Sequence, residues 1–210
     1  MQQVLDDLNW RYATKRFDAD QKLSVEQLAA LKESIRLTAT SYGLQAYKVL
    51  QVDTPEIREK LMEASFGQRP VVEASHLFVF CAYRNVEEAD VYKYVNLIAK
   101  TRGTDPKDLE PFSIGIIGSL EKKSQEEIEN WTTRQTYIAL GQLLHTCASL
   151  RIDALPMEGF NPKQYNEILG LDKLNLTATL ACPVGFRHAE DIAQFKKKVR
   201  KPNEELFDLR

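Results

Sequence analysis

The sequence predicts an α+β fold in which a central sheet of few strands is surrounded by many helices. Three stretches have the composition of strands, and they cover residues 47–52, 77–82 and 176–184. The segments between them show helical patterns, but strands and helices do not alternate strictly along the chain. A doubly wound parallel sheet would require that alternation, so the α+β arrangement fits better.

The N-terminal part begins with a helical stretch that ends at a basic heptapeptide, residues 11–17. The next helix has explicit signals, because Ser24 and Gln27 form a capping box and leucines occupy both staple positions around it. We expect this helix over 25–37. Residues 47–52 then form a short strand, and Thr54-Pro55 opens another short helix that reaches Leu61.

The second strand, 77–82, is a continuous apolar run, as expected of a strand covered on both faces. The stretch 176–184 is similar, although Pro183 interrupts it near its end. Between 86 and 130 the sequence is helical but irregular, since Asp105-Pro106 restarts a helix and Pro111 disturbs it. We interpret 86–130 as a helical excursion over the core and a lid.

A long helix is expected over 132–150, and its second half leaves almost no polar face. Such a helix lies at the centre of a protein or contacts a partner subunit. A short helix follows, with Asn161 as its N-cap, Pro162 at its first position and Gly170 just past its end.

The composition indicates a single domain over residues 1–210, with 43% hydrophobic and 28% charged residues. The net charge of −2 gives no general attraction for nucleic acid. No apolar run is long enough to cross a membrane, and the N-terminus carries two aspartates where a secretory signal would be basic. We therefore expect a cytoplasmic protein without a nucleic-acid or membrane partner.

Several common chemistries have no signature in the chain. It lacks the glycine-rich loops GxGxxG and GxxxxGK[ST] and the nucleophile elbow GxSxG. His76, His145 and His188 neither pair at helical spacing nor lie near a cysteine or carboxylate cluster, so no metal site is expected. A cofactor enzyme without a glycine loop remains.

Three features have the order and spacing of a known flavin site. They are the heptapeptide Arg11-Tyr12-Ala13-Thr14-Lys15-Arg16-Phe17, the loop Pro156-Met157-Glu158-Gly159-Phe160, and the late basic pair Lys198 and Arg200. Alone, the first is compatible with a solvated helix end and the second with a plain turn before a helix. Together they resemble the nitroreductase family. The resemblance implies a central, mostly antiparallel sheet, an extended C-terminal tail and bound FMN.

The resemblance also implies roles for individual residues. Arg11, Lys198 and Arg200 would hold the FMN phosphate, while Lys15 would lie near flavin N1 and stabilise the reduced ring. The amide of Gln68 would meet the pyrimidine edge. The backbone N–H groups of Glu158 and Gly159 would face N5, within a cofactor-binding loop that includes Pro156 and Met157.

Further residues are assigned to the site on the same basis. Thr40, Ser41 and Gln45 match a family segment, and Thr40 and Ser41 would contact the cofactor bound mainly to the other subunit. Tyr12 and Ala13 stand where the family has its Arg-x-Ser motif, so a hydroxyl contact from position 13 is lost. Phe112 and Trp131 could cover the substrate, although aromatic residues in irregular segments are more often simple packing.

The function implied is a homodimeric oxidoreductase with tightly bound FMN at the subunit interface. NAD(P)H would give hydride to flavin N5, and a nitroaromatic, quinone or dihydropteridine acceptor would take it in a second, ping-pong step. No catalytic acid or base is required, because the flavin performs the chemistry. Two alternatives stay open: a non-catalytic flavin-binding or redox-sensing protein, and a cofactor-free helical interaction module.

Overall fold

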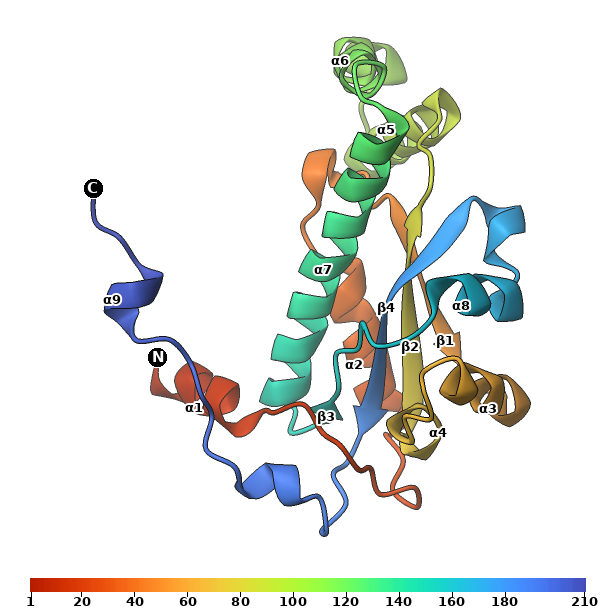
Figure 1. Cartoon of the computed structure of the whole chain (residues 1–210). Helices are drawn as coiled ribbons and strands as arrows, with labels where there is room; N and C mark the ends of the chain where they lie inside the picture. Colours follow the sequence, from red (N-terminus) through yellow and green to blue (C-terminus); the bar gives the residue numbers. More distant parts are fainter.

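The computed structural model describes residues 1–210 and contains one four-stranded sheet (Figure 1). Its strands are β1 (Tyr47–Val52), β2 (His76–Tyr83), β3 (Asp153–Ala154) and β4 (Leu176–Gly185), in the order β1-β2-β4-β3. Every neighbouring pair is antiparallel. The predicted α+β fold with an antiparallel sheet is thus confirmed, and only the two-residue β3 was not predicted.

Strand β2 shows why its continuous apolar run is needed. Leu77 and Val79 point into one hydrophobic cluster, whereas Phe78 and Phe80 belong to a cluster on the opposite face of the sheet. Alternate side chains of a strand point to opposite faces, so a strand that is covered twice must be apolar at every position. The carbonyl of Pro183 in β4 accepts the N–H of Leu155 at 3.0 Å, so the proline nitrogen, which has no hydrogen to donate, also faces the side of the short edge strand β3 and removes no hydrogen bond to β2.

Helices cover both faces of the sheet (Figure 1). On one face lie α2 (Val25–Arg36) and α7 (Gln125–Ser149), which pack against each other and against β2. The other face is covered by α3 (Pro55–Glu63), α4 (Pro70–Glu73), α8 (Pro162–Leu169) and the 3₁₀ helix η3 (Leu171–Leu174).

The helix ends follow the predicted signals. Ser24 and Gln27 form the capping box of α2 in both directions. At α8 the side chain of Asn161 accepts the N–H of Gln164 at 3.2 Å, and Gly170 ends the helix in the left-handed conformation, with φ of 65°. These helices therefore begin and end within two residues of their predicted limits.

The region between β2 and α7 forms helices with their own core. It contains α5 (Glu88–Arg102), η2 (Pro106–Leu109) and α6 (Glu110–Leu120), which project beyond the end of the sheet (Figure 1). Their apolar side chains form a third cluster with Ile128 of α7. The prediction that Pro111 disturbs a helix is wrong. Pro111 lies in the first turn of α6, where its missing N–H costs nothing.

The predicted start of the long helix at Thr132 is wrong. Helix α7 begins at Gln125, where Ser124 and Glu127 form a second capping box. The first two turns are polar, so they lack the apolar signal that marks the rest of the helix, and the cap is the only local indication of the true start.

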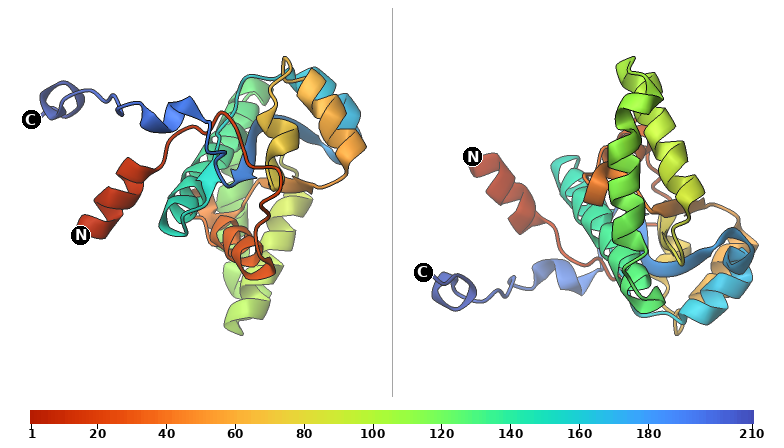
Figure 2. Two further views of the ribbon diagram at one scale, coloured as in Figure 1. Left: turned by 90° about the horizontal axis from the view of Figure 1, so that it is seen from below. Right: turned by 90° about the horizontal axis from the view of Figure 1, so that it is seen from above.

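Both ends of the chain project from the same side of the body (Figure 2). Helix α1 (Gln2–Trp10) is followed by the extended basic segment, and the C-terminal tail contains only η4 (Ile192–Phe195) and α9 (Asn203–Leu206). A last 3₁₀ turn, η1 (Ser41–Gly43), precedes β1. None of the helices has the length and apolar character needed to cross a bilayer.

Candidate functional site

The basic segment after α1 lies against the sheet in an extended conformation. Ala13 forms a parallel bridge with Ala154, and Phe17 forms an antiparallel bridge with Arg187, just beyond β4. Since parallel chains advance together, the segment continues from Ala13 along the direction of the loop at Pro156. Two features that are 140 residues apart in the sequence are therefore neighbours in the structure.

The three predicted phosphate-binding cations lie together. The ammonium group of Lys198 donates to the carbonyl of Leu8 at 2.8 Å and also to the carbonyl of Arg11, which ties the tail to the end of α1. Burial, followed by repulsion from Arg200, lowers the pKa of Arg11. Burial, followed by repulsion from Arg11 and Arg200, lowers the pKa of Lys198 as well. None of the three cations forms an ion pair with a carboxylate.

The loop from Pro156 to Phe160 is held between β4 and two other elements. Met157 exchanges backbone hydrogen bonds with Ala181 at 2.8 and 3.0 Å, and its side chain is buried in the core on the α3–α8 face. The amide of Gln68 donates to the carbonyl of Gly159 at 2.6 Å, and the hydroxyl of Tyr137 donates to Glu158 at 2.7 Å. The structure thus brings Gln68 to the loop.

Gly159 lies where the Gln68 side chain crosses the loop. A Cβ at this position would lie 3.1 Å from the Gln68 amide nitrogen, which is a tight contact. The backbone of Glu158 and Gly159 is exposed at this point, so an approaching planar group could reach it.

The buried carboxylate of Asp191 holds the basic segment through hydrogen bonds. Asp191, which is 1% exposed, accepts hydrogen bonds from the N–H of Lys15 at 2.8 Å and from the hydroxyl of Tyr12 at 3.0 Å. The guanidinium of Arg187 lies 4.6 Å from the ring centre of Tyr12 and pairs with Asp153 at 2.7 Å. The side chain of Lys15 itself is exposed.

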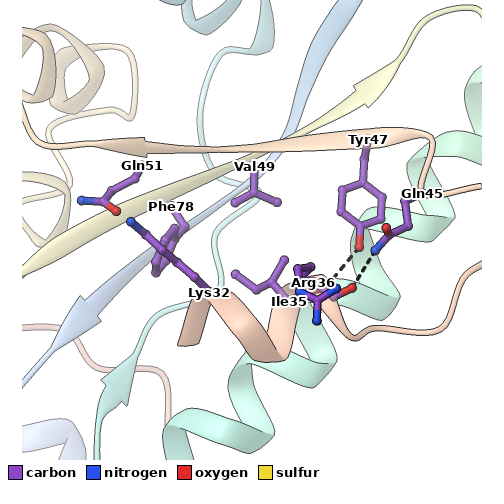
Figure 3. Close-up of a pocket in the computed structure, with 8 residues that line it drawn as sticks. All are labelled: Lys32, Ile35, Arg36, Gln45, Tyr47, Val49, Gln51 and Phe78. Atoms are coloured by element: carbon purple, nitrogen blue, oxygen red, sulfur yellow. Dashed lines mark hydrogen bonds between the residues drawn. The ribbon is translucent and has the colours of Figure 1, made fainter. Parts of the chain in front are cut away.

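The segment with Thr40, Ser41 and Gln45 lies elsewhere in the same chain. The N–H of Ser41 donates to Gln135 of α7 at 2.9 Å, and the hydroxyl of Thr40 accepts the N–H of Gln45 at 3.1 Å. Gln45 borders a cavity of about 370 Å³ between α2 and β1, where its amide donates to the carbonyl of Arg36 at 2.9 Å (Figure 3). One chain therefore does not bring this segment to the Arg11 cluster.

The two predicted substrate-covering aromatics lie on different helices, Phe112 on α6 and Trp131 on α7. Trp131 is half-buried against the third cluster and lies 6.3 Å from the ring of Tyr42. Phe112 is on α6 and is 39% exposed. Their surroundings are these helices, and the structure gives neither of them a place at the Pro156–Phe160 loop.

Three residues around the site were not found from the sequence. Asp191 and Tyr137 act through tertiary contacts, which leave no local pattern. Phe66 is 77% exposed, has a positive φ of 57° and stands two residues before Gln68. A phenylalanine next to Gly67 in a turn is the one local signal that could have indicated an exposed aromatic beside the loop.

The assembled geometry defines a class of site. A cation cluster lies at one end, an exposed glycine-containing loop with free backbone donors at the other, and an exposed lysine stands on the segment between them. Such an arrangement suits a ligand that has a phosphate at one end and a planar polar ring at the other.

Comparisons with known proteins agree with this class. A sequence profile described as the Nitroreductase family matches residues 8–186. The major NAD(P)H-flavin oxidoreductase of Aliivibrio fischeri is 29% identical and is matched over 98% of both chains. The chain belongs to the nitroreductase family.

Solved structures show the same fold. A nitroreductase-like protein from Streptococcus mutans has a TM-score of 0.87 at 18% identity, covering 100% of this chain and 99% of its own. A protein from Exiguobacterium sibiricum, solved in complex with FMN, has a TM-score of 0.83 at 18% identity, covering 99% and 97%. The predicted family and fold are confirmed.

Proposed function

We propose that this protein is an FMN-dependent oxidoreductase that takes hydride from NAD(P)H. The observation that supports this most directly is the convergence of Arg11, Lys198 and Arg200 from the two ends of the chain. Three cations that repel each other without a carboxylate partner destabilise the free protein, and a phosphate dianion would relieve that repulsion. The residues present therefore fit the phosphate of FMN.

The ring would lie between the basic segment and the Pro156–Phe160 loop. Gln68 would face the pyrimidine edge, and its present bond to Gly159 keeps the amide at the loop. Lys15 would place its ammonium group near N1, where a positive charge favours the reduced ring over the oxidised one. The N–H groups of Glu158 and Gly159 would face N5.

FMN, when bound, supplies hydride transfer at N5. The protein groups bind and orient it, and the exposed face of the ring would admit NAD(P)H and the acceptor in turn. Tyr137 holds the carboxylate of Glu158 and so restrains the loop that would approach N5. The protein would need no buried side chain to donate a proton to the acceptor, because water could reach the open site.

A homodimer would complete the site, with FMN at the subunit interface. Helix α1 and the C-terminal tail leave leucines exposed, such as Leu8 at 44% and Leu209 at 99%. Exposed apolar side chains on two projecting arms favour burial against a second copy. The segment at Thr40 and Ser41, which lies away from the cations in its own chain, would then contact the cofactor of the other subunit.

The acceptors proposed are nitroaromatics, quinones and dihydropteridines. The exposed aromatic Phe66, beside Gln68, supports a planar acceptor that stacks over the open ring face. Phe112 of α6 and Trp131 of α7 stay proposals as further covering residues, from either subunit.

Flavin absorbance before and after NADH or NADPH, without air, tests the proposed function. The protein supplied with FMN should be yellow, should bleach with the nicotinamide, and should regain its colour when a quinone is added. Yellow protein that does not bleach would instead indicate a non-catalytic flavin-binding protein. Colourless protein after FMN addition would overturn the proposal as a whole.

A further inference from the structure

Asp191 joins the two parts of the chain that surround the candidate cofactor site. One of its oxygens accepts hydrogen bonds from the N–H of Lys15 at 2.8 Å, from the hydroxyl of Tyr12 at 3.0 Å and from the N–H of Arg16 at 3.3 Å. The other oxygen accepts the N–H of Ala193 at 3.0 Å, at the start of η4. One carboxylate thus fixes both the basic segment and the beginning of the tail.

This carboxylate is buried without a cation. The guanidinium of Arg16 pairs with the exposed Glu190 instead, at 2.8 Å. Burial alone would raise the pKa of Asp191, but the hydrogen bonds from the N–H groups of Lys15 and Ala193 outweigh it and lower that pKa. The group is therefore ionised at neutral pH, and its charge is stabilised by oriented N–H donors.

Asp191 therefore determines the backbone at Lys15. The N–H groups of positions 15 and 16 and the hydroxyl of position 12 all donate to the same oxygen, while the side chain of Lys15 is exposed. The three donors come from the one segment that contains Lys15, so the carboxylate restrains the backbone from which that side chain projects.

We infer that Asp191 is a positioning residue that sets the flavin reduction potential and FMN affinity by holding Lys15 and the tail in place. This inference rests on the proposed FMN function. The sign of the potential change separates positioning from simple electrostatics. If Asp191 acted only through its negative charge, its removal would favour the electron-rich reduced ring and raise the reduction potential of the flavin. If Asp191 acts by holding Lys15 near the ring, its removal displaces the Lys15 ammonium group and lowers that potential.

The experiment compares Asp191→Asn and Asp191→Ala with the unaltered full-length protein. FMN affinity is measured by flavin fluorescence quenching, the potential of the bound flavin by redox titration, and the fold by thermal unfolding. We expect the FMN Kd to rise about tenfold or more, as for the loss of charge-assisted hydrogen bonds. The potential should become more negative in both variants, and trypsin should cleave the apoprotein tail faster.

Asn166→Ala is the matched control. Asn166 is also buried and also accepts a backbone N–H, from Ala178 at 2.9 Å, but it joins α8 to β4. This variant should lower the unfolding temperature and leave the flavin potential unchanged. An equal potential shift in Asn166→Ala, or a higher or unchanged potential in the Asp191 variants, would overturn the inference.

A double-substitution cycle tests the route through Lys15. Lys15→Gln should lower the potential in the unaltered protein and lower it less when Asp191 is already asparagine. Equal effects in both backgrounds would mean that Asp191 does not act through Lys15. If the unaltered protein fails to bind FMN, the proposed function fails, whereas normal FMN binding with insensitive Asp191 variants defeats only this inference.

Discussion

At the scale of single residues, the candidate site contains a cluster of three cations. Arg11, Lys198 and Arg200 come from opposite ends of the chain, and burial, followed by repulsion within the cluster, lowers the pKa of Arg11 and Lys198. Such a cluster costs folding free energy in the absence of an anion. In the proposed function, a bound phosphate dianion would offset that cost.

Removal of single cations should weaken FMN binding. Arg11→Ala and Lys198→Met are each expected to raise the FMN Kd roughly tenfold or more, because each removes one charge-assisted contact to the phosphate. Lys173→Met, at an exposed lysine of η3, should leave the Kd unchanged. Fluorescence titration of apoprotein measures all three, and equal affinities throughout would contradict the assignment of the phosphate site.

FMN affinity should also fall at alkaline pH because of Lys198. The pKa of Lys198 in the free protein lies below the ordinary lysine value, and a bound phosphate dianion raises it. Affinity is therefore full below the free-protein pKa and is lost as pH rises from that pKa towards the higher pKa of the complex.

The measurement is FMN Kd against pH for the unaltered protein and for Lys198→Arg. Arginine stays charged over this range, so the variant should show a smaller decline. Superimposable profiles would mean that Lys198 does not sense the phosphate.

At the scale of elements, caps define the helices where apolar patterns fail. The apolar signal of α7 starts well inside the helix, and its polar first turns depend on the capping box of Ser124 and Glu127. The side chains of that helix also contact two predicted site segments, since Gln135 accepts the N–H of Ser41 and Tyr137 donates to Glu158.

Loss of the α7 cap should destabilise the protein modestly. Ser124→Ala is expected to lower the free energy of unfolding by about 1 kcal/mol, because the N–H of Glu127 loses its partner. Ser149→Ala, at the opposite end of α7, should change it far less. Urea denaturation measures both, and identical stabilities would show that the cap contributes nothing.

At the scale of the whole molecule, the two projecting ends carry apolar side chains that the rest of the chain does not cover. Helix α1 and the tail extend from one side of the body and expose leucines that a monomer has no means to cover (Figure 2). The same ends supply the cations of the proposed phosphate site, so the proposed dimer and the proposed FMN binding would depend on the same segments.

The protein should therefore have twice the mass of one chain in solution. Leu8→Asp or Leu206→Asp is expected to shift it towards monomer, since each would place a charge in an apolar contact that the proposed dimer buries. Leu174→Asp is the control, because the exposure of Leu174, 53%, lies between those of Leu8, 44%, and Leu206, 61%, and Leu174 is on η3, away from both arms. Light scattering gives the mass, and a monomer at all concentrations would contradict the proposed dimer.

The sequence by itself determined the elements and the family. Strands β1, β2 and β4 and helices α2 and α8 are specified by local composition and caps, which act over a few residues. The motifs at Arg11 and Pro156 and the late basic pair Lys198 and Arg200 together resembled the nitroreductase family, because such a resemblance depends on residue type and order.

Only the tertiary structure decided which residues meet. The two-residue β3 exists because Asp153 and Ala154 pair with the end of β4, and Asp191 matters because Lys15 and Tyr12 lie against it. Neither feature has a local pattern, since both depend on contacts between residues that are far apart in the sequence. Long-range contacts are selected by the packing of the whole chain, and no short stretch of sequence contains that information.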